Sequence, residues 1–457
     1  MIDKEMNEAI RIQLHRFTIW CQQSINRRIF LATATAGAFT GLAHLAAIVK
    51  ELVVAHRFGT GDAMDAFLIA FLLPSSIMNI VAGSFNAALI PTYIQVRERE
   101  GWEAAQRLFS NIFIGSALLL IFLSVLLVVL APIVLPLLGT GFHPDKLALT
   151  QSLFFILIPV LLLSGLAKIG GAVLNAGEHF AMVAVSPLVT YAVTVIVLLW
   201  AGKAWGIYAL AVGTVIGFAL EWGFLLWGLK RRGHPLVPRW DGLNPATMQV
   251  IRQFFPMVAG ALLMSSTTFV DQAMAAILNP GSVASLNYGN RVTGVLIGLA
   301  ATALGTAVIP YFSQQVARED WAGVQSTFHG YLRLIFMISL PIAGLLFAFS
   351  EPVVRVLFQK GSFTAQDTAV VSQVQACYAL QIPFYIAGTL AVRLISSLRA
   401  NHVLLWASAI NMTVNVVLNY LFMKKMGVAG IALSTSCVYL FSFSFLYVYW
   451  YRSFRKG

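Results

Sequence analysis

The residues of this sequence that could do chemistry are ionisable side chains inside long apolar stretches. Lys50, Glu51, Asp271 and Arg291 lie in such stretches, and His44 precedes Lys50 by six residues. A charge at the centre of a membrane costs about 2.5 to 3.5 kcal/mol on insertion scales, so these groups must face protein or a watery cavity. Lys50 and Arg291 could bind an anion there. When no anion is bound, Glu51 could pair with these two basic residues. The structural alternative is a set of ion pairs that only hold helices together.

His44 illustrates the structural alternative, in which an ionisable residue only packs between helices. Six residues correspond to a rotation of about 240° along a helix, so His44 and Lys50 share a cavity only if the helix bends. A lone histidine can equally be a hydrogen-bonded packing residue. Four further ionisable residues fall inside apolar stretches: Lys168, Glu221, Arg333 and Arg393. The three cations lie near the ends of their stretches, from where their long side chains can snorkel to water.

A stripe of amides suggests a second kind of chemistry. Asn411, Asn415 and Asn419 recur every four residues and therefore share one helix face. The simpler interpretation is interhelical hydrogen bonding. The alternative is a small-cation site in which Asp271 supplies charge and Asn411, Asn415 and Thr435 supply oxygen ligands.

The composition identifies the medium in which these groups must be positioned. Hydrophobic residues make up 59% of the 457 residues and charged residues only 11%, with a mean hydropathy of +0.80. Such a chain is typical of an integral membrane protein. The apolar runs exceed the roughly 20 residues that cross a bilayer as a helix, and they do not alternate as barrel strands do. They predict about twelve helical spans: 29–55, 64–94, 108–131, 147–175, 180–201, 204–228, 250–278, 284–312, 328–350, 369–398, 402–423 and 427–450.

The sequence also matches itself. Pro91 and Pro310, like Arg99 and Arg318, are related by an offset of 219 residues, and Glu51 is related to Asp271 by 220. We therefore predict an all-α membrane protein with two six-helix lobes related by a parallel internal repeat, an arrangement typical of alternating-access transporters.

Basic residues at the predicted span ends indicate the orientation. Eighteen lie in the terminal segments and even-numbered connections, and seven lie in the opposite connections. Both termini are therefore predicted to be cytoplasmic. The predicted organisation is a cytoplasmic amphipathic segment 1–28, an N-lobe 29–229, a cytoplasmic linker 230–249, a C-lobe 250–451 and a cytoplasmic tail 452–457.

Several function classes are disfavoured. The net charge of +12 is spread along the membrane edges, so it does not indicate nucleic-acid binding. Cys21, Cys377 and Cys437 have no metal-binding spacing. A membrane enzyme would need a large outer loop with catalytic residues or a recognisable catalytic motif, and the sequence has neither. We expect a transporter, with no cofactor other than Na⁺ or H⁺ as a coupling ion.

Three blocks of residues resemble the MurJ/MviN lipid II flippases of the multidrug/oligosaccharidyl-lipid/polysaccharide exporter superfamily. The first block contains Arg57, Phe58, Gly59, Gly61, Asp65, Ala66, Phe67, Ala70, Phe71 and Pro74. The second contains Tyr288, Arg291, Gly298, Ala303, Leu304, Gly305 and Pro310. The third contains Glu351, Pro352, Leu357, Phe358, Gly361, Phe363, Thr364 and Asp367.

The resemblance implies a V-shaped pair of lobes in a bacterial inner membrane. Their central cavity would move an undecaprenyl-diphosphate-linked saccharide from the cytoplasmic to the periplasmic leaflet. Lys50 and Arg291 would bind the diphosphate, Asp65 and Glu51 would orient these cations, and His44 and Asn79 would line the cavity. It also implies sodium binding between the seventh, eleventh and twelfth spans. The implied partners are membrane lipids and a glycosyltransferase or polymerase.

Departures from the family pattern leave the saccharide open. Lys50 and His44 stand where the family has arginines, Asn79 lies in a stretch that carries further arginines in relatives, and Ala82 replaces an acid. Many members also have two further C-terminal spans. An exopolysaccharide or capsule repeat unit and lipid II are both candidate substrates. A multidrug/cation antiporter of the same superfamily is the alternative, although Lys50 and Arg291 would repel cationic substrates.

Overall fold

The chain forms a helical membrane protein, described here from a computed structural model covering residues 25–234, 239–398 and 400–454. Most of the predicted amphipathic segment 1–28, with Cys21, lies outside these ranges, as do residues 455–457 of the tail. The ranges contain no strand. Their helices are α2 (Ile25–Phe58), α3 (Asp62–Glu100), α4 (Trp102–Leu138), α5 (Pro144–Ala176), α6 (Phe180–Trp205), α7 (Ile207–Arg231), α8 (Pro245–Ala276), α9 (Ser282–Ala317), α10 (Trp321–Ala348), α11 (Ser350–Phe358), α12 (Ala365–Ala379), α13 (Gln381–Ser397), α14 (Asn401–Met426) and α15 (Val428–Phe454).

The predicted all-α membrane fold is confirmed. Among the described residues, 11 helical segments are long and apolar enough to cross a membrane, with α12 and α13 forming one of them. The predicted span 284–312 corresponds to α9, a 36-residue helix that is not among these 11. Every predicted span therefore coincides with a long helix or, for 369–398, with the pair α12 and α13.

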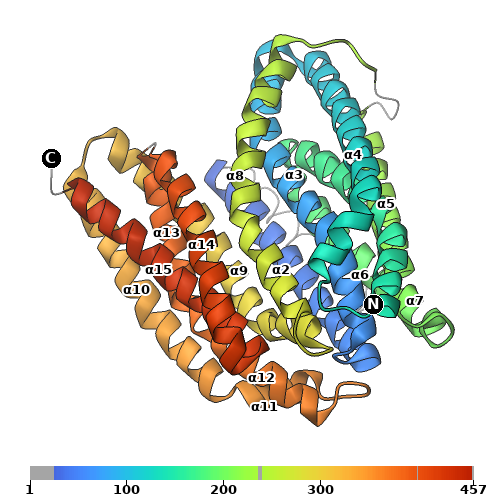
Figure 1. Cartoon of the computed structure of the whole chain (residues 1–457). Coiled ribbons are helices and arrows are strands. Elements are labelled where there is room, and N and C mark those ends of the chain that lie inside the picture. Colours follow the sequence, from blue (N-terminus) through green and yellow to red (C-terminus); the bar gives the residue numbers. More distant parts are fainter. Residues whose placement is uncertain (1–24, 235–238, 399, 455–457) are drawn as a thin grey trace, which may run out of the picture.

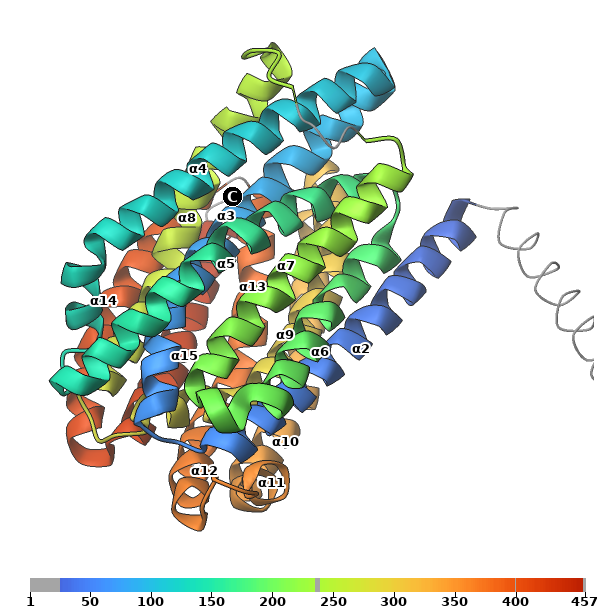
Figure 2. The ribbon, with the colours of Figure 1, turned by 90° about the vertical axis from the view of Figure 1, so that its right-hand side faces the viewer.

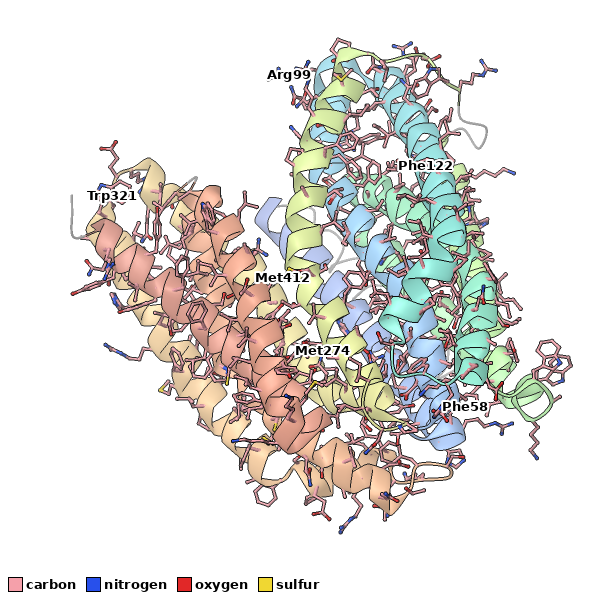
Figure 3. The ribbon with its side chains drawn as sticks, in the orientation of Figure 1. Phe58, Arg99, Phe122, Met274, Trp321 and Met412 are labelled. Atoms are coloured by element: carbon pink, nitrogen blue, oxygen red, sulfur yellow. The ribbon has the colours of Figure 1, made fainter. Side chains whose placement is uncertain are left out.

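The helices form two lobes that are joined at one end and diverge at the other (Figure 1). One lobe contains α2 to α7, where α6 packs against both α2 and α7 (Figure 2). The other contains α9 to α15. We call the end where α3 begins and α11 and α12 lie the joined end, and the opposite end, where α3 ends and α10 begins, the divergent end. Figure 3 shows Phe58 at the joined end, and Arg99 and Trp321 on separate lobes at the divergent end.

Helix α8 packs on both lobes. Near its start, the ring of Phe254 stacks on Phe85 of α3 with centroids 4.2 Å apart, and Val250 is fully buried in the core of the first lobe. Toward its end, Asp271 is hydrogen-bonded to α14 and α15. The chain segment that follows the predicted linker 230–249 therefore connects the lobes along its length.

The joined end depends on backbone geometry that glycine supplies. Gly59 and Gly361 both have left-handed φ angles, of 57° and 63°. A Cβ atom on Gly59 would collide with the carbonyl of Ser362, and one on Gly361 with that of His56. The Ser362 amide also donates to the His56 carbonyl at 2.8 Å. Two loops from different lobes therefore meet backbone to backbone, which only glycine allows at these positions.

At the divergent end, aromatic residues bury a histidine of the α7–α8 connection. His234 is 7% exposed and packs on Trp102 and Phe109, with ring centroids 4.9 and 5.6 Å away. Gln106 donates to the neighbouring Gly233 carbonyl at 2.8 Å. Burial, followed by the nearby Arg232 and His179, lowers the pKa of His234 to about 4. The connection is thereby fixed to the start of α4 by a neutral histidine.

Stability should therefore depend on pH below neutrality. Because the pKa of His234 lies below its ordinary value of 6.5, its contribution is complete above about pH 6.5 and is lost as pH falls toward 4. Each pH unit in that window should remove up to about 1.4 kcal/mol of unfolding free energy. Unfolding of the purified protein between pH 7 and 4 measures this slope. The His234→Phe variant should show a smaller slope, and an equal slope would contradict the assignment.

Candidate functional site

Three charged residues predicted to share a site are in contact. The Lys50 ammonium and the Arg291 guanidinium each lie 2.8 Å from the same carboxylate oxygen, Oε1 of Glu51. The side chain of Glu51 is 10% exposed, those of Lys50 and Arg291 24% and 48%. Two cations therefore share one anion and retain a net positive charge, and both basic side chains remain partly exposed. We call these three residues the charged triad.

The triad is contributed by both lobes. Lys50 and Glu51 lie on α2 and Arg291 on α9. Glu51 precedes the end of α2 at Phe58 by about two helical turns, or roughly 10 Å. Arg291 follows the start of α9 by a similar distance. The triad therefore lies a short distance inside the joined end, where an anion entering between the lobes would meet it.

Two other predicted lining residues lie apart from the triad. His44 on α2 and Asn79 on α3 are exposed. Within the described part of the chain, no hydrogen bond or ion pair connects either one to Lys50, Glu51 or Arg291. The rotation of about 240° between His44 and Lys50 accounts for the separation of that pair. Their predicted contact with a ligand stays a prediction.

Asp65 corrects the sequence interpretation. We expected it to orient the cavity cations, but it is 1% exposed and its carboxylate is occupied elsewhere. The backbone N–H groups of Gly281 and Ala284 donate to its Oδ2 and Oδ1 at 2.7 and 2.8 Å. These amides belong to the start of α9 in the opposite lobe, where the helix dipole favours an anion. Asp65 therefore caps a helix across the two lobes.

Lys146 is a functional candidate that the sequence interpretation missed. Its ammonium lies 2.8 Å from Asp65 Oδ2 and 2.7 Å from Asp62 Oδ1, and it lies over the Phe142 ring at 4.0 Å. We counted it among the basic residues of the outer connections, because it directly precedes the predicted span 147–175. Its side chain is only 8% exposed. The buried ion pair with Lys146 therefore fixes the Asp65 carboxylate, which in turn binds the start of α9 in the second lobe.

Further cross-lobe hydrogen bonds surround Asp65. The Ser362 hydroxyl donates to the Arg57 carbonyl at 3.0 Å, and the Thr60 hydroxyl donates to Asp367. Asp367 also forms the capping box of α12 with Thr364. The joined end is consequently held by polar contacts between the two lobes.

The predicted cation ligands are only partly brought together. Asn415 and Thr435 donate to Asp271 at 2.9 and 3.1 Å. Asn411 does not join them, since its amide donates to Ser442 at 2.9 Å. Asn419 takes its place and donates to Asp271 Oδ1 at 2.7 Å. All three asparagines share one helix face, but Asp271 lies at the level of the last two.

This cluster has the donor set that a small hard cation requires. It combines one carboxylate, the Thr435 hydroxyl and two amides, all on α8, α14 and α15. The amide oxygen of Asn419 is buried without a hydrogen-bond partner, which costs free energy unless another group satisfies it. In the described part of the chain, no group of three or more histidine, cysteine or acidic side chains is placed to hold a metal ion. An ion bound here would be held by oxygens of mixed type.

Taken together, the long apolar helices, the two lobes joined at one end and the charged triad between them define a multi-pass membrane transporter. The sequence matches the family described as lipid II flippase MurJ over residues 54–457, so the chain belongs to that family. The family resemblance found in the sequence is thereby confirmed.

Individual relatives agree. The chain is 27% identical to the probable lipid II flippase MurJ of Synechocystis over 86% of this chain and 76% of that protein. It is 26% identical to the lipid II flippase MurJ of Burkholderia cenocepacia over 89% of this chain and 80% of that protein.

Solved structures share the fold. A lipid II flippase MurJ in an inward closed conformation superposes with a TM-score of 0.75 at 21% identity, covering 90% of this chain and 86% of that one. A multidrug resistance MATE family transporter in an inward-facing conformation superposes with a TM-score of 0.74 at 13% identity, covering 91% of this chain and 97% of that one. At these identities the likeness concerns the fold alone.

The role of Asp65 can be tested with its neighbour as the control. Asp65→Asn removes a buried partner of Lys146, and breaking such a pair costs about 3 to 5 kcal/mol. Asp62→Asn removes the other carboxylate of the same lysine, but Asp62 is 57% exposed, and exposed pairs contribute about 1 kcal/mol or less. Unfolding of both purified variants measures the difference. Equal losses would show that Asp65 does not hold the joined end.

Proposed function

We propose that the protein flips an undecaprenyl-diphosphate-linked saccharide from the cytoplasmic to the periplasmic leaflet by alternating access. Family membership supports lipid II as the substrate. The observation that carries the proposal is the charged triad, in which Glu51 pairs with Lys50 and Arg291 from opposite lobes. A diphosphate is the costliest part of such a lipid to bring into the membrane, and fixed cations lower that cost.

The distribution of basic residues supports a proposed orientation in the membrane. Arg99, Arg107, Arg231 and Arg252 lie at the divergent end, and basic residues accumulate on the cytoplasmic side. In our proposal the divergent end faces the cytoplasm, both termini are cytoplasmic, and the joined end faces the periplasm. The conformation described is then ready to receive a headgroup from the cytoplasmic leaflet.

Binding would exchange the partners of the triad. The substrate diphosphate brings more negative charge than the single Glu51 carboxylate and can therefore displace it from Arg291, whose planar guanidinium suits phosphate oxygens. Lys50 contributes a second, less directional charge. Loss of the contact between Glu51 and Arg291 removes one link between α2 and α9. The contacts around Asp65 would then remain as the main hold on the joined end.

Rocking of the lobes would complete the cycle while the polyprenyl chain stays in lipid. A charge that crosses the membrane couples to the potential at about 2.3 kcal/mol per 100 mV. A cation gradient is the other possible energy source. We propose that Asp271, Asn415, Asn419 and Thr435 would hold the coupling ion, Na⁺ or H⁺. A bound ion would neutralise Asp271 and fix α8 to α14 and α15.

The cationic triad also separates this proposal from a multidrug/cation antiporter. The fold is shared with MATE transporters, but a site with two cations and one acid repels a cationic drug. The saccharide is less strongly specified, because Asn79 lies where relatives carry further positive charge. An exopolysaccharide or capsule repeat unit is therefore the alternative substrate. A glycosyltransferase or polymerase would be the protein partner.

Transport in reconstituted vesicles tests the triad. Arg291→Ala and Lys50→Ala each remove a charge-assisted contact of about 1.5 to 3 kcal/mol, which corresponds to a 10- to 100-fold slower flipping of lipid II. Arg291→Lys should be intermediate. Arg333→Ala is the matched control, because Arg333 is an exposed arginine of α10. Unchanged rates in both alanine variants would refute the cationic site.

The same assay distinguishes the substrates. Vesicles carrying lipid II are compared with vesicles carrying undecaprenyl diphosphate linked to a different saccharide. Faster flipping of lipid II is expected. A strong preference for the other lipid would retain the triad mechanism and replace the substrate.

The ion site has a readout independent of transport. If Na⁺ binds only the folded protein, a concentration of 100 times its Kd should stabilise it by about 2.7 kcal/mol. Na⁺ in place of a bulky organic cation should therefore raise the melting temperature of the wild type and of Asn411→Ala, but not that of Asp271→Asn or Asn419→Ala. Equal shifts in all four proteins would contradict the site.

A further inference from the structure

The second lobe carries a groove that the proposed transport site does not use. Helices α10 and α15 form its walls, and both pack on α13, whose Pro383 and Phe384 also line it. Helix α10 lies along the edge of this lobe that is farthest from α2 to α7 (Figure 1). The groove therefore faces the surrounding lipid rather than the space between the lobes.

The groove consists of two hollows in line. One, with a volume of about 380 Å³, is nearer the divergent end and includes Arg333 of α10. The other, of about 320 Å³, includes Gly344 farther along the same helix. Between them, the ring of Phe336 packs edge-on against Phe443 and Phe384, with centroids 5.8 and 6.0 Å away. Gly344 follows Arg333 by 11 residues, so the groove is roughly 16 Å long.

The two hollows differ in chemistry. Apart from a serine and a cysteine, the deeper hollow is lined by apolar side chains, and the Ser436 hydroxyl is occupied because it donates to the Cys377 carbonyl at 2.6 Å. The outer hollow contains an arginine, a histidine and a tyrosine. His329 Nδ1 lies 3.0 Å from the Gln325 carbonyl oxygen, and its Nε2 lies 3.4 Å from the Tyr447 hydroxyl. The histidine and the tyrosine are thus used within the protein.

Arg333 is the basic residue of the outer hollow that has no protein partner. In the part of the chain that the structure describes, no hydrogen bond or ion pair occupies its guanidinium. It lies near the start of the predicted span 328–350, from where its side chain can reach the level of the lipid headgroups. A planar guanidinium suits phosphate oxygens, which it can bind in a bidentate manner.

The first lobe shows the same seam in a closed form. Trp102 and Trp321 begin α4 and α10 and are related by the internal offset of 219 residues. Eleven residues after Trp102, Phe113 of α4 stacks on Trp222 of α7 with centroids 5.7 Å apart. A Cβ atom on Gly170 of α5 would lie 2.9 Å from the Trp222 ring. Aromatic side chains therefore fill this seam in the first lobe, at the level where the second lobe has an arginine beside a hollow.

We propose that the groove binds a phospholipid with an anionic headgroup, with its phosphate at Arg333 and one acyl chain in the apolar hollow. The length supports a lipid of one leaflet, because half of a hydrocarbon core of about 30 Å is about 15 Å. Basic pockets between membrane helices bind anionic headgroups. In a zwitterionic headgroup, an ammonium accompanies the phosphate and opposes the arginine. The site is separate from the triad and does not rest on the proposed transport.

Native mass spectrometry of the purified protein with added phosphatidylglycerol tests the headgroup contact. The wild type should bind one molecule more tightly than any further ones. Arg333→Ala should bind that molecule about 10- to 100-fold more weakly, which is the effect of losing one charge-assisted contact. Arg393→Ala is the matched control, because Arg393 is an exposed arginine of α13 that lines neither hollow. Equal affinities of the two variants would overturn the proposal.

Competing ligands identify the occupant in the same experiment. Phosphatidylglycerol should bind the wild type more tightly than zwitterionic phosphatidylethanolamine. Glycerol phosphate has the phosphate but no acyl chain and should not displace it at equal concentration. Equal binding of the two phospholipids, displacement by glycerol phosphate, or tighter binding of undecaprenyl phosphate at this site would each contradict the assignment.

A substitution in the deeper hollow tests the acyl chain. A Cβ atom on Gly344 would meet no atom within 4 Å, so Gly344→Leu should fill the hollow without disturbing the fold and should weaken phosphatidylglycerol binding. Gly223→Leu is the control, because Gly223 of α7 is equally open but lies on the other lobe. Unchanged binding by Gly344→Leu would show that the chain lies elsewhere. These measurements do not depend on flipping, so the lipid site can fail while the transport proposal stands, and the reverse also holds.

Discussion

The buried contact between Asp65 and the start of α9 is the interaction on which the rest of the structure depends. A carboxylate of the first lobe satisfies two backbone amides of the second, and Lys146 balances its charge. In a membrane, neither the carboxylate nor the helix terminus could be left unsatisfied without a cost of several kcal/mol. The lobes are therefore joined where the carboxylate of one lobe and the backbone amides of the other satisfy each other's hydrogen bonds. They diverge at the opposite end, and α8 packs on both lobes along the intervening length.

The remaining membrane-embedded charges follow the same constraint at other depths. The triad lies about two turns inside the joined end and leaves its two cations only partly neutralised. The cluster around Asp271 joins α8 to the second lobe through neutral donors, and Glu221 is enclosed by hydroxyl groups in the first lobe. A substrate that supplies negative charge would change the balance at the triad first, because of these three sites only the triad contains basic side chains. The neighbouring Asp65 contact is then the point at which binding could act on the joined end.

Much of this arrangement could be predicted from the sequence, because its causes are local. Long apolar runs must be helices in a membrane, and charges such as Lys50, Glu51 and Arg291 must find partners there. The prediction was wrong for Asp65, because its partners are backbone amides of a helix more than 200 residues away, which no side-chain pattern reveals. Lys146 was missed because it directly precedes the predicted span 147–175, whereas the helix already begins at Pro144. The four-residue periodicity correctly predicted that Asn411, Asn415 and Asn419 share one helix face. It could not predict which of them Asp271 contacts, because that depends on how α8 packs against α14.

The central claim, that the two ends of the molecule open in alternation, is tested most directly by paired distance measurements. In a cysteine-free background, spin labels at His143 and Lys360 report on the joined end, and labels at Arg99 and Trp321 report on the divergent end (Figure 3). Addition of an undecaprenyl-diphosphate-linked saccharide should create a population in which the first distance is longer and the second is shorter. If the two distances lengthened together, or if neither responded to a substrate that is flipped, the alternating-access account would be contradicted.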